Sequence, residues 1–155
     1  MAAVDSMGRL RAFLMAILLL GMAGSATELL LLAHHEDFKQ LIPLSLLAIA
    51  FGVLAWHGGT RSRASVRGLQ VVMTLFVIAG LAGVILHVRS SMEFQSEVDP
   101  SLRGLKLLAK ALMAKAPPAL APGVMVQLGL LGLAFTYRHP ALLASTHPNP
   151  SVEEK

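Results

Sequence analysis

The sequence contains no cysteine, and this absence removes several kinds of chemistry at once. Without thiols the chain forms no disulfide, no thiolate metal site, no CxxC redox pair and no cysteine nucleophile. Any metal or proton chemistry must therefore come from histidine, carboxylate and other oxygen or nitrogen groups. The absence of cysteine gives no information about the compartment.

Charged residues are also scarce, at 14% of the chain against 55% hydrophobic residues, and the mean hydropathy is +0.66. The net charge of +4 is modest, and the basic residues flank hydrophobic runs. A nucleic-acid footprint needs a basic face, so no nucleic-acid partner is expected. Arginines beside apolar runs are instead typical of membrane proteins, where they set the orientation.

Sequence motifs that carry catalysis are missing as well. The chain has no GxSxG, no phosphate-binding loop and no dinucleotide fingerprint after a strand. Gly58-Gly59 lies in an arginine-rich connection, and we interpret it as a flexible linker. The sequence therefore leans against an enzyme, and no cofactor is expected.

The residues that are present form long apolar runs. About 20 apolar residues in a helix span a hydrocarbon core of ~30 Å. We therefore predict an all-α integral membrane protein, a bundle of four transmembrane helices. The predicted spans are 10–33, 38–56, 69–88 and 119–137. The polar remainder is too small for a separate soluble domain, so residues 1–140 form a single membrane domain.

The connection between the third and fourth spans carries its own helix signals. Asp99-Pro100 predicts a helix start, with aspartate as N-cap and proline in the first helical position, and Pro117-Pro118 predicts the end. Between residues 100 and 115 the apolar and basic side chains fall on different faces. The apolar face has Leu105, Leu108, Ala109 and Leu112, and the basic face has Arg103, Lys106 and Lys110.

This pattern predicts a short amphipathic helix with two alternative positions. It would lie in the membrane interface, or it would pack as a lid on the rim of the bundle while its lysines reach the headgroups.

Residues 141–155 follow the last span, are rich in proline and show no periodicity. We predict that this tail is disordered.

Arginine in the short connections predicts the orientation. The N-terminal segment holds Arg9 and Arg11, and the connection after the second span holds Arg61, Arg63 and Arg67. These positions favour a cytoplasmic location of both termini and of the arginine-rich connection. The basic residues of the long 89–118 connection then lie on the outer side, against the rule. Trp56 and Tyr137 end hydrophobic runs, as interfacial aromatic anchors do.

The N-terminus allows a second interpretation. Gly24-Ser25-Ala26 resembles the small-residue cleavage site of a secretory signal, which would remove residues 1–26. However, hydrophobic residues resume at Leu29, and the uncut run has the length of a spanning helix. We therefore favour an uncleaved first span.

Glu28 is the strongest functional lead. A charged side chain near the bilayer centre costs about 2.5–3.5 kcal/mol on insertion scales, so such residues usually face protein or water. Helical spacing puts Glu28 on the face of Gly21 and Gly24, where helices approach closely. We expect it to point toward a neighbouring helix. His87 and Gln127 lie in the same half of the membrane, and the predicted depths are compatible with a Glu28–Gln127 hydrogen bond with His87 above it.

Two interpretations of this intramembrane polar site remain. In the favoured interpretation Glu28 holds helices together through hydrogen bonds, because such bonds are common between membrane helices. Alternatively, Glu28 relays protons or cations, or contacts a ligand.

A metal or haem site is a weaker alternative. His34, His35, Asp37 and His87 are suitable ligand types at one predicted mouth of the bundle. Adjacent histidines diverge by about 100° on a helix, however, and no established ligand spacing occurs. A haem between two histidines has still less support, because His57 and His87 fall at opposite predicted faces. We therefore predict no metal site.

Two segments carry a resemblance. They are ATELLLLAHHEDFKQLIPL at residues 26–44, and MEFQSEVDPSLRG with PALAPGVMVQLGLLGLAFTYRHP between residues 92 and 140. In them the chain resembles a group of uncharacterised small four-helix bacterial integral membrane proteins. The resemblance implies the bacterial cytoplasmic (inner) membrane, and it implies no activity, cofactor or site. The missing cysteines also argue against the four-helix enzymes that reduce quinones.

Together these observations lead to one functional expectation. We expect a multi-pass, non-enzymatic accessory or structural component that contacts the lipid bilayer and either a second copy or other membrane subunits. The alternatives are a small proton- or cation-coupled transporter that uses Glu28, and, less favoured, a membrane metal or haem protein. A small-molecule ligand is not identifiable from the sequence.

Overall fold

The computed structural model describes residues 2–32, 38–113 and 120–143. Within these ranges every regular element is helical, which confirms the predicted all-α class. The helices are α1 (Ala2–Leu31), α2 (Phe38–Thr60), α3 (Arg63–Val98), α4 (Gly104–Leu112), α5 (Leu120–Thr136) and α6 (Pro140–Leu143).

Three of these helices are long and apolar enough to cross a membrane. The candidate spans are Ser6–Leu31, Gln40–Thr60 and Arg63–Val98. The helix α5 is apolar but has 17 residues, fewer than the about 20 that a perpendicular span requires. The structure therefore supports a membrane protein with three candidate spans, and the prediction of a fourth is not confirmed by length.

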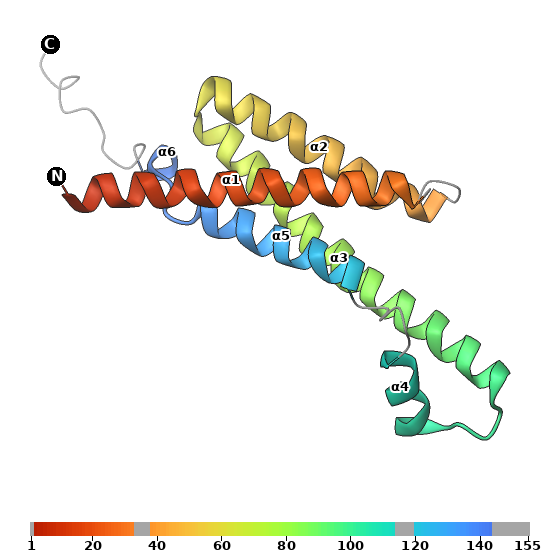
Figure 1. The fold of residues 1–155 in the computed structure, drawn as a ribbon. Coiled ribbons are helices and arrows are strands. Elements are labelled where there is room, and N and C mark those ends of the chain that lie inside the picture. Colours follow the sequence, from red (N-terminus) through yellow and green to blue (C-terminus); the bar gives the residue numbers. More distant parts are fainter. Residues whose placement is uncertain (1, 33–37, 114–119, 144–155) are drawn as a thin grey trace, which may run out of the picture.

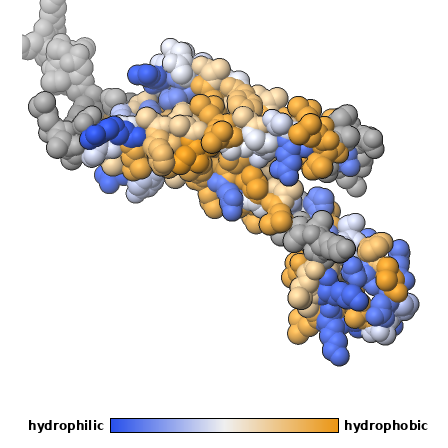
Figure 2. Space-filling view, viewed as in Figure 1, coloured by the Kyte–Doolittle hydropathy of each residue, from blue (hydrophilic) through white to orange (hydrophobic). Residues whose placement is uncertain are grey.

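The helix α3 is the centre of the bundle. Figure 1 shows α5 lying along α3, α2 folded back against α3 near its start, and α1 crossing α5. Apolar side chains from four helices meet there and are buried, and they include Leu18, Met22, Leu47, Leu69, Met73, Phe76, Leu128 and Phe135. Large apolar residues elsewhere on α1, α2 and α3 are exposed, as expected for surfaces that face lipid (Figure 2).

Glycines allow α3 and α5 to pack closely. A Cβ atom added at Gly129 of α5 would lie 2.7 Å from the Met73 carbonyl oxygen, and one added at Gly80 of α3 would lie 2.8 Å from the Val126 nitrogen. These neighbours are backbone atoms that a side chain cannot displace cheaply. Small residues where two membrane helices meet permit this kind of approach.

One end of the bundle contains three segments, which are the N-terminal part of α1, the connection between α2 and α3, and the C-terminus of α5 (Figure 1). There the Arg11 guanidinium donates hydrogen bonds to the carbonyls of Tyr137 (3.4 Å) and Arg138 (3.0 Å). The predicted grouping of these segments at one end is thus present.

The helix α3 is longer than its predicted span of 69–88. At 1.5 Å per residue its 36 residues measure about 54 Å, well above the ~30 Å hydrocarbon core. Its last turns carry polar residues and continue away from the bundle, where α4 folds back against them (Figure 1).

The helix α4 begins at Gly104, later than the predicted start near residue 100. Asp99 is the C-cap of α3, and its Oδ1 atom accepts hydrogen bonds from the Ser101 backbone nitrogen (3.0 Å) and the Ser101 hydroxyl (2.6 Å). The aspartate therefore closes a turn between two helices instead of capping α4. Arg103 is the N-cap of α4 and makes no side-chain cap hydrogen bond.

The predicted disordered tail also needs correction at its start. Residues 140–143 form the helical turn α6, with Pro140 in the first position. The His139 Nδ1 atom accepts a hydrogen bond from the Ala141 backbone N–H (3.2 Å), so the histidine side chain acts as the cap. The rest of the predicted tail, residues 144–155, lies outside the described residues.

Candidate functional sites

Glu28 and Gln127 line one open cavity between α1 and α5. The cavity has a volume of about 290 Å³, and its other lining residues are Leu120, Ala121, Gly123 and Val124. Both polar side chains are exposed. The sequence thus selected two residues that come from helices distant in the chain and share one cavity.

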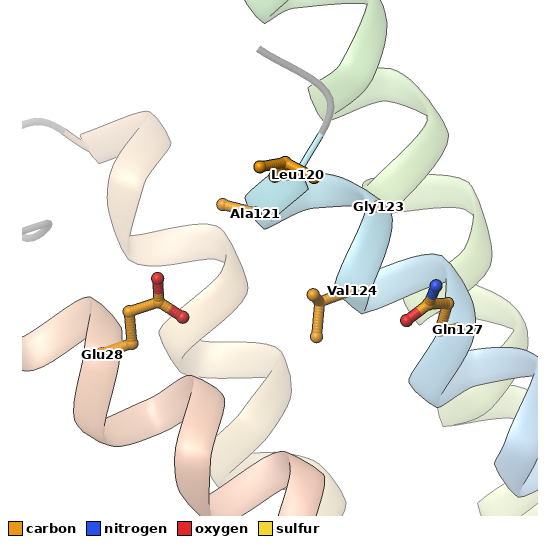
Figure 3. A pocket seen from close by; sticks show the side chains of 6 residues that line it. All are labelled: Glu28, Leu120, Ala121, Gly123, Val124 and Gln127. Atoms are coloured by element: carbon orange, nitrogen blue, oxygen red, sulfur yellow. The ribbon is translucent and has the colours of Figure 1, made fainter. Parts of the chain in front are cut away.

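The two side chains enter this cavity at different places. Figure 3 shows the Glu28 carboxylate directed from the last turn of α1 toward the first turn of α5, with Val124 between it and Gln127 in this view. Among the described residues no hydrogen bond joins Glu28 to Gln127. The first turn of a helix carries unpaired N–H groups and a partial positive charge, which favours a nearby carboxylate.

His87 is not part of this cavity. It lies on α3 with an exposed side chain, one turn beyond Gly83, where an added Cβ would contact the Pro122 side chain. The predicted trio is therefore split, because Glu28 and Gln127 share a cavity and His87 does not line it.

The low-priority metal candidates are placed only in part. His34, His35 and Asp37 lie outside the described residues, so the structure gives no information on their positions. Among the residues that it does describe, no three side chains of the His, Cys, Asp or Glu types gather closely enough to hold a metal ion.

A second polar cluster lies at the arginine-rich end, and sequence reasoning missed it. His57 of α2 has only 6% of its surface exposed, and its Nδ1 atom lies 2.9 Å from the Ser65 hydroxyl of α3. The His57 ring also contacts Phe135 and His139 edge-on, at centroid distances of 5.8 and 5.2 Å. The cluster therefore joins α2, α3 and the C-terminal end of α5.

The hydrogen bonds determine which nitrogen atoms carry protons. Ser65 donates its hydroxyl proton to the Ser62 carbonyl (2.8 Å), and the His57 tautomer that fits this arrangement carries its hydrogen on Nδ1 and donates it to the Ser65 oxygen. His139 has the opposite arrangement, because its Nδ1 atom accepts from the Ala141 N–H. A neutral His139 therefore carries its proton on Nε2.

This arrangement is suited to a structural connection between neutral imidazoles. Protonation of His139 would place a second N–H against the Ala141 N–H and add a positive charge near Arg11. Burial, and to a lesser degree the charges of His57 and Arg11, lower the pKa of His139 below its ordinary value.

The lowered pKa of His139 predicts a pH-dependent stability. The unfolded chain binds this proton at a higher pH than the folded protein does, so the contribution is fully present above about pH 6.5 and is lost as the pH falls below that value. We expect the thermal midpoint in detergent to decrease on acidification from pH 7.5 to 5.5, with a smaller decrease in His139→Gln. Equal decreases in both proteins would contradict this assignment.

Comparisons with protein-family models, with curated proteins and with solved structures find no match. The fold itself defines the class, a helical protein with three candidate membrane-spanning helices.

Proposed function

We propose that this protein is a non-enzymatic accessory or structural component of a bacterial cytoplasmic membrane, where it works within an oligomer or a larger complex. The observation that carries this proposal is the open cavity with Glu28 and Gln127, which lies on a bundle whose surface is otherwise largely apolar. Lipid tails offer no hydrogen bonds to such groups, whereas a neighbouring protein helix does.

The packing of α1 supports the same proposal. The helix contacts α5 and, to a smaller extent, α2, and its outward side remains exposed. Gly24 lies on that side with nothing within 4 Å of an added Cβ, next to exposed Ala23 and Thr27. A surface of small residues beside a carboxylate and an amide is suited to a close-packed helix from another subunit.

We further propose that α5 is the fourth span and that both termini are cytoplasmic. The helix packs along α3 throughout the bundle, which places its short apolar segment beside the central span (Figure 1). Arg11, Arg61 and Arg138 lie at the end formed by the N-terminal part of α1 and the C-terminal end of α5, and they favour the cytoplasmic side for that end.

A proton- or cation-coupled transporter is the second candidate, and the same cavity favours it. A carboxylate and an amide oxygen around one opening are suitable ligands for a proton or a hard cation. The two functions differ in what they require of Glu28. A structural contact needs hydrogen bonding, whereas coupling needs a group that ionises.

The substitution Glu28→Gln separates these functions. We expect Glu28→Gln to retain the oligomer or complex, because the amide still forms hydrogen bonds, and Glu28→Leu to weaken assembly by about tenfold, equivalent to about 1.4 kcal/mol. Assembly is measured by co-purification and by native mass spectrometry from lipid nanodiscs. Val71→Ala, which changes an exposed residue of α3 and leaves the α1 surface unaltered, is the control and should assemble normally.

A measurement of ion flux in liposomes can contradict the structural proposal. If liposomes with the native chain show pH-dependent flux that Glu28→Gln abolishes while the variant remains folded, the structural proposal fails and the transporter is correct. Isolation as a single copy without any partner would also contradict the proposal.

A further inference from the structure

The end of α3 and the helix α4 form a hairpin beyond the apolar part of the bundle (Figure 1). Residues 89–98 of α3 continue the helix without a break and include polar and charged side chains. Figure 2 shows that hydrophilic residues gather in this region, with hydrophobic residues among them. The hairpin is defined here as residues 89–112.

One face of α4 is already covered by α3. Ala111 is fully buried, its carbonyl accepts a hydrogen bond from the Ser91 hydroxyl (3.2 Å), and Leu107 and Leu108 are half-buried. The helix is therefore docked on the end of α3. A different set of its apolar side chains remains exposed.

The hairpin exposes two apolar stripes, one on each helix. On α3, Phe94 and Val98 are spaced four residues apart and are 61% and 64% exposed. On α4, Leu105, Ala109 and Leu112 share one face, and Leu105 is 83% exposed. Phe94 and Val98 lie beyond the predicted span of 69–88, and large exposed apolar side chains there indicate a surface for a partner.

Charges of opposite sign border the two stripes. Glu93 and Glu97 follow the α3 stripe at helical spacing, and Lys106 and Lys110 follow the α4 stripe. The acidic edge on one helix and the basic edge on the other make the hairpin complementary to a second hairpin.

The four charged residues differ in their partners among the residues that the structure describes. Glu93 lies 3.9 Å from Arg89, with both side chains at least 70% exposed, and such a pair contributes little. The pKa of Asp99 is lowered mainly by the hydrogen bonds from Ser101. The positive charge of Lys110 lowers this pKa further, to a smaller extent. Glu97 and Lys106 form no ion pair with any other residue that the structure describes.

We propose that two copies of this chain dimerise through their hairpins, with the α3 stripe of one copy on the α4 stripe of the other and Glu97 opposite Lys106 of the partner subunit. This contact is isologous, because each hairpin supplies both stripes and both charge signs. A membrane surface is the poorer occupant, since Glu93 and Glu97 beside the α3 stripe would be repelled by anionic headgroups.

This inference rests on the proposed function, because it names the partner of the assembly as a second copy. It adds a contact that is independent of the cavity at Glu28.

Charge reversal and charge exchange test the contact in the full chain. The dimer dissociation constant is measured in lipid nanodiscs or mild detergent by sedimentation and native mass spectrometry. We expect Glu97→Lys and Lys106→Glu each to raise it roughly tenfold to a hundredfold, because each changed pair occurs twice in a two-fold dimer. The combined variant E97K/K106E should return to within about threefold of the native value. Arg67→Glu, at the opposite end of α3, should leave it unchanged.

Cross-linking supplies a second measurement, because the chain has no cysteine of its own. Phe94→Cys combined with Leu105→Cys should form covalent dimers under mild oxidation. Ile85→Cys, which is also 61% exposed on α3 but lies within the predicted span of 69–88, is the control and should form few.

The outcomes separate the two proposals. Native oligomers that persist unchanged in both single reversals, or no recovery in the exchange variant, would overturn the hairpin dimer and leave the proposed function standing. A single copy that co-purifies with another protein would likewise overturn the hairpin dimer and leave the proposed function standing. A single copy without a partner would overturn both.

Discussion

The variant Gly129→Ala is expected to lose about 2–3 kcal/mol of unfolding free energy, a large effect for one added methyl group. The added Cβ would lie 2.7 Å from the Met73 carbonyl oxygen and 3.0 Å from the Val77 nitrogen, both backbone atoms of α3. The two central helices would have to separate, and the packing around Met73 and Phe76 would loosen. Reversible unfolding in detergent, followed by circular dichroism, measures the change.

Gly123→Ala is the matched control on the same helix. No atom lies within 4 Å of a Cβ at this position, so the methyl group meets no obstacle. Because alanine favours a helix over glycine by up to about 1 kcal/mol, the variant should be equal to or more stable than the native chain. Similar losses in both variants would show that α3 and α5 do not pack as closely as the structure has them.

The second large effect is expected at Ser65. Ser65→Ala should cost about 1–3 kcal/mol, because it leaves the buried His57 Nδ1–H without its acceptor. The substitution also removes the bond from the Ser65 hydroxyl to the Ser62 carbonyl, which is near the start of α3. Unfolding in detergent measures the loss, and proton NMR provides a second readout because the slowly exchanging His57 Nδ1–H signal should disappear.

Thr74→Ala is the control for this prediction. Thr74 is exposed on the same helix and its hydroxyl donates a hydrogen bond to the Gln70 carbonyl, so its loss should cost less than about 0.5 kcal/mol. If Ser65→Ala is as mild as the control, His57 does not depend on Ser65 in the way the geometry indicates.

The sequence predicted the helical class because the class depends on simple periodicity. Glu28 and Gln127 line one cavity, and among the described residues no hydrogen bond of the predicted kind joins them. Apolar runs of spanning length indicate helices, and depth along a helix follows from its rise per residue. The depth of a residue along its helix does not predict how the helix is rotated about its axis, and so it does not predict which way the side chain faces. His87 lies in the expected half of α3, yet it does not line the cavity, and Val124 lies between Glu28 and Gln127 in Figure 3.

The cluster of His57 and His139 was not predictable in the same way. Its members come from the end of α2, the start of α3 and the residues after α5, and only their packing brings them together. One local signal was present, since His57 and His139 both follow apolar runs at the predicted cytoplasmic side. Polar residues at the same predicted membrane face, taken together, would have suggested the contact.

The hairpin shows how local signals compete. Asp99-Pro100 is compatible with a helix start, and it is equally compatible with a turn closed by the aspartate side chain. The hydrogen bonds from Ser101 satisfy Asp99 in the turn, so α3 extends to Val98 and α4 starts at Gly104. Likewise, the tail from residue 141 was predicted to be disordered, whereas residues 141–143 continue the helical turn that Pro140 begins, with His139 as its cap.

Native mass spectrometry of the full chain, released from lipid nanodiscs, tests the central claim most directly. If the protein is a structural component, the spectra should contain two or more copies, or one copy with a different protein, and Glu28→Gln should preserve that species. Spectra that contain only single copies with bound lipid, at all protein concentrations, would contradict the account.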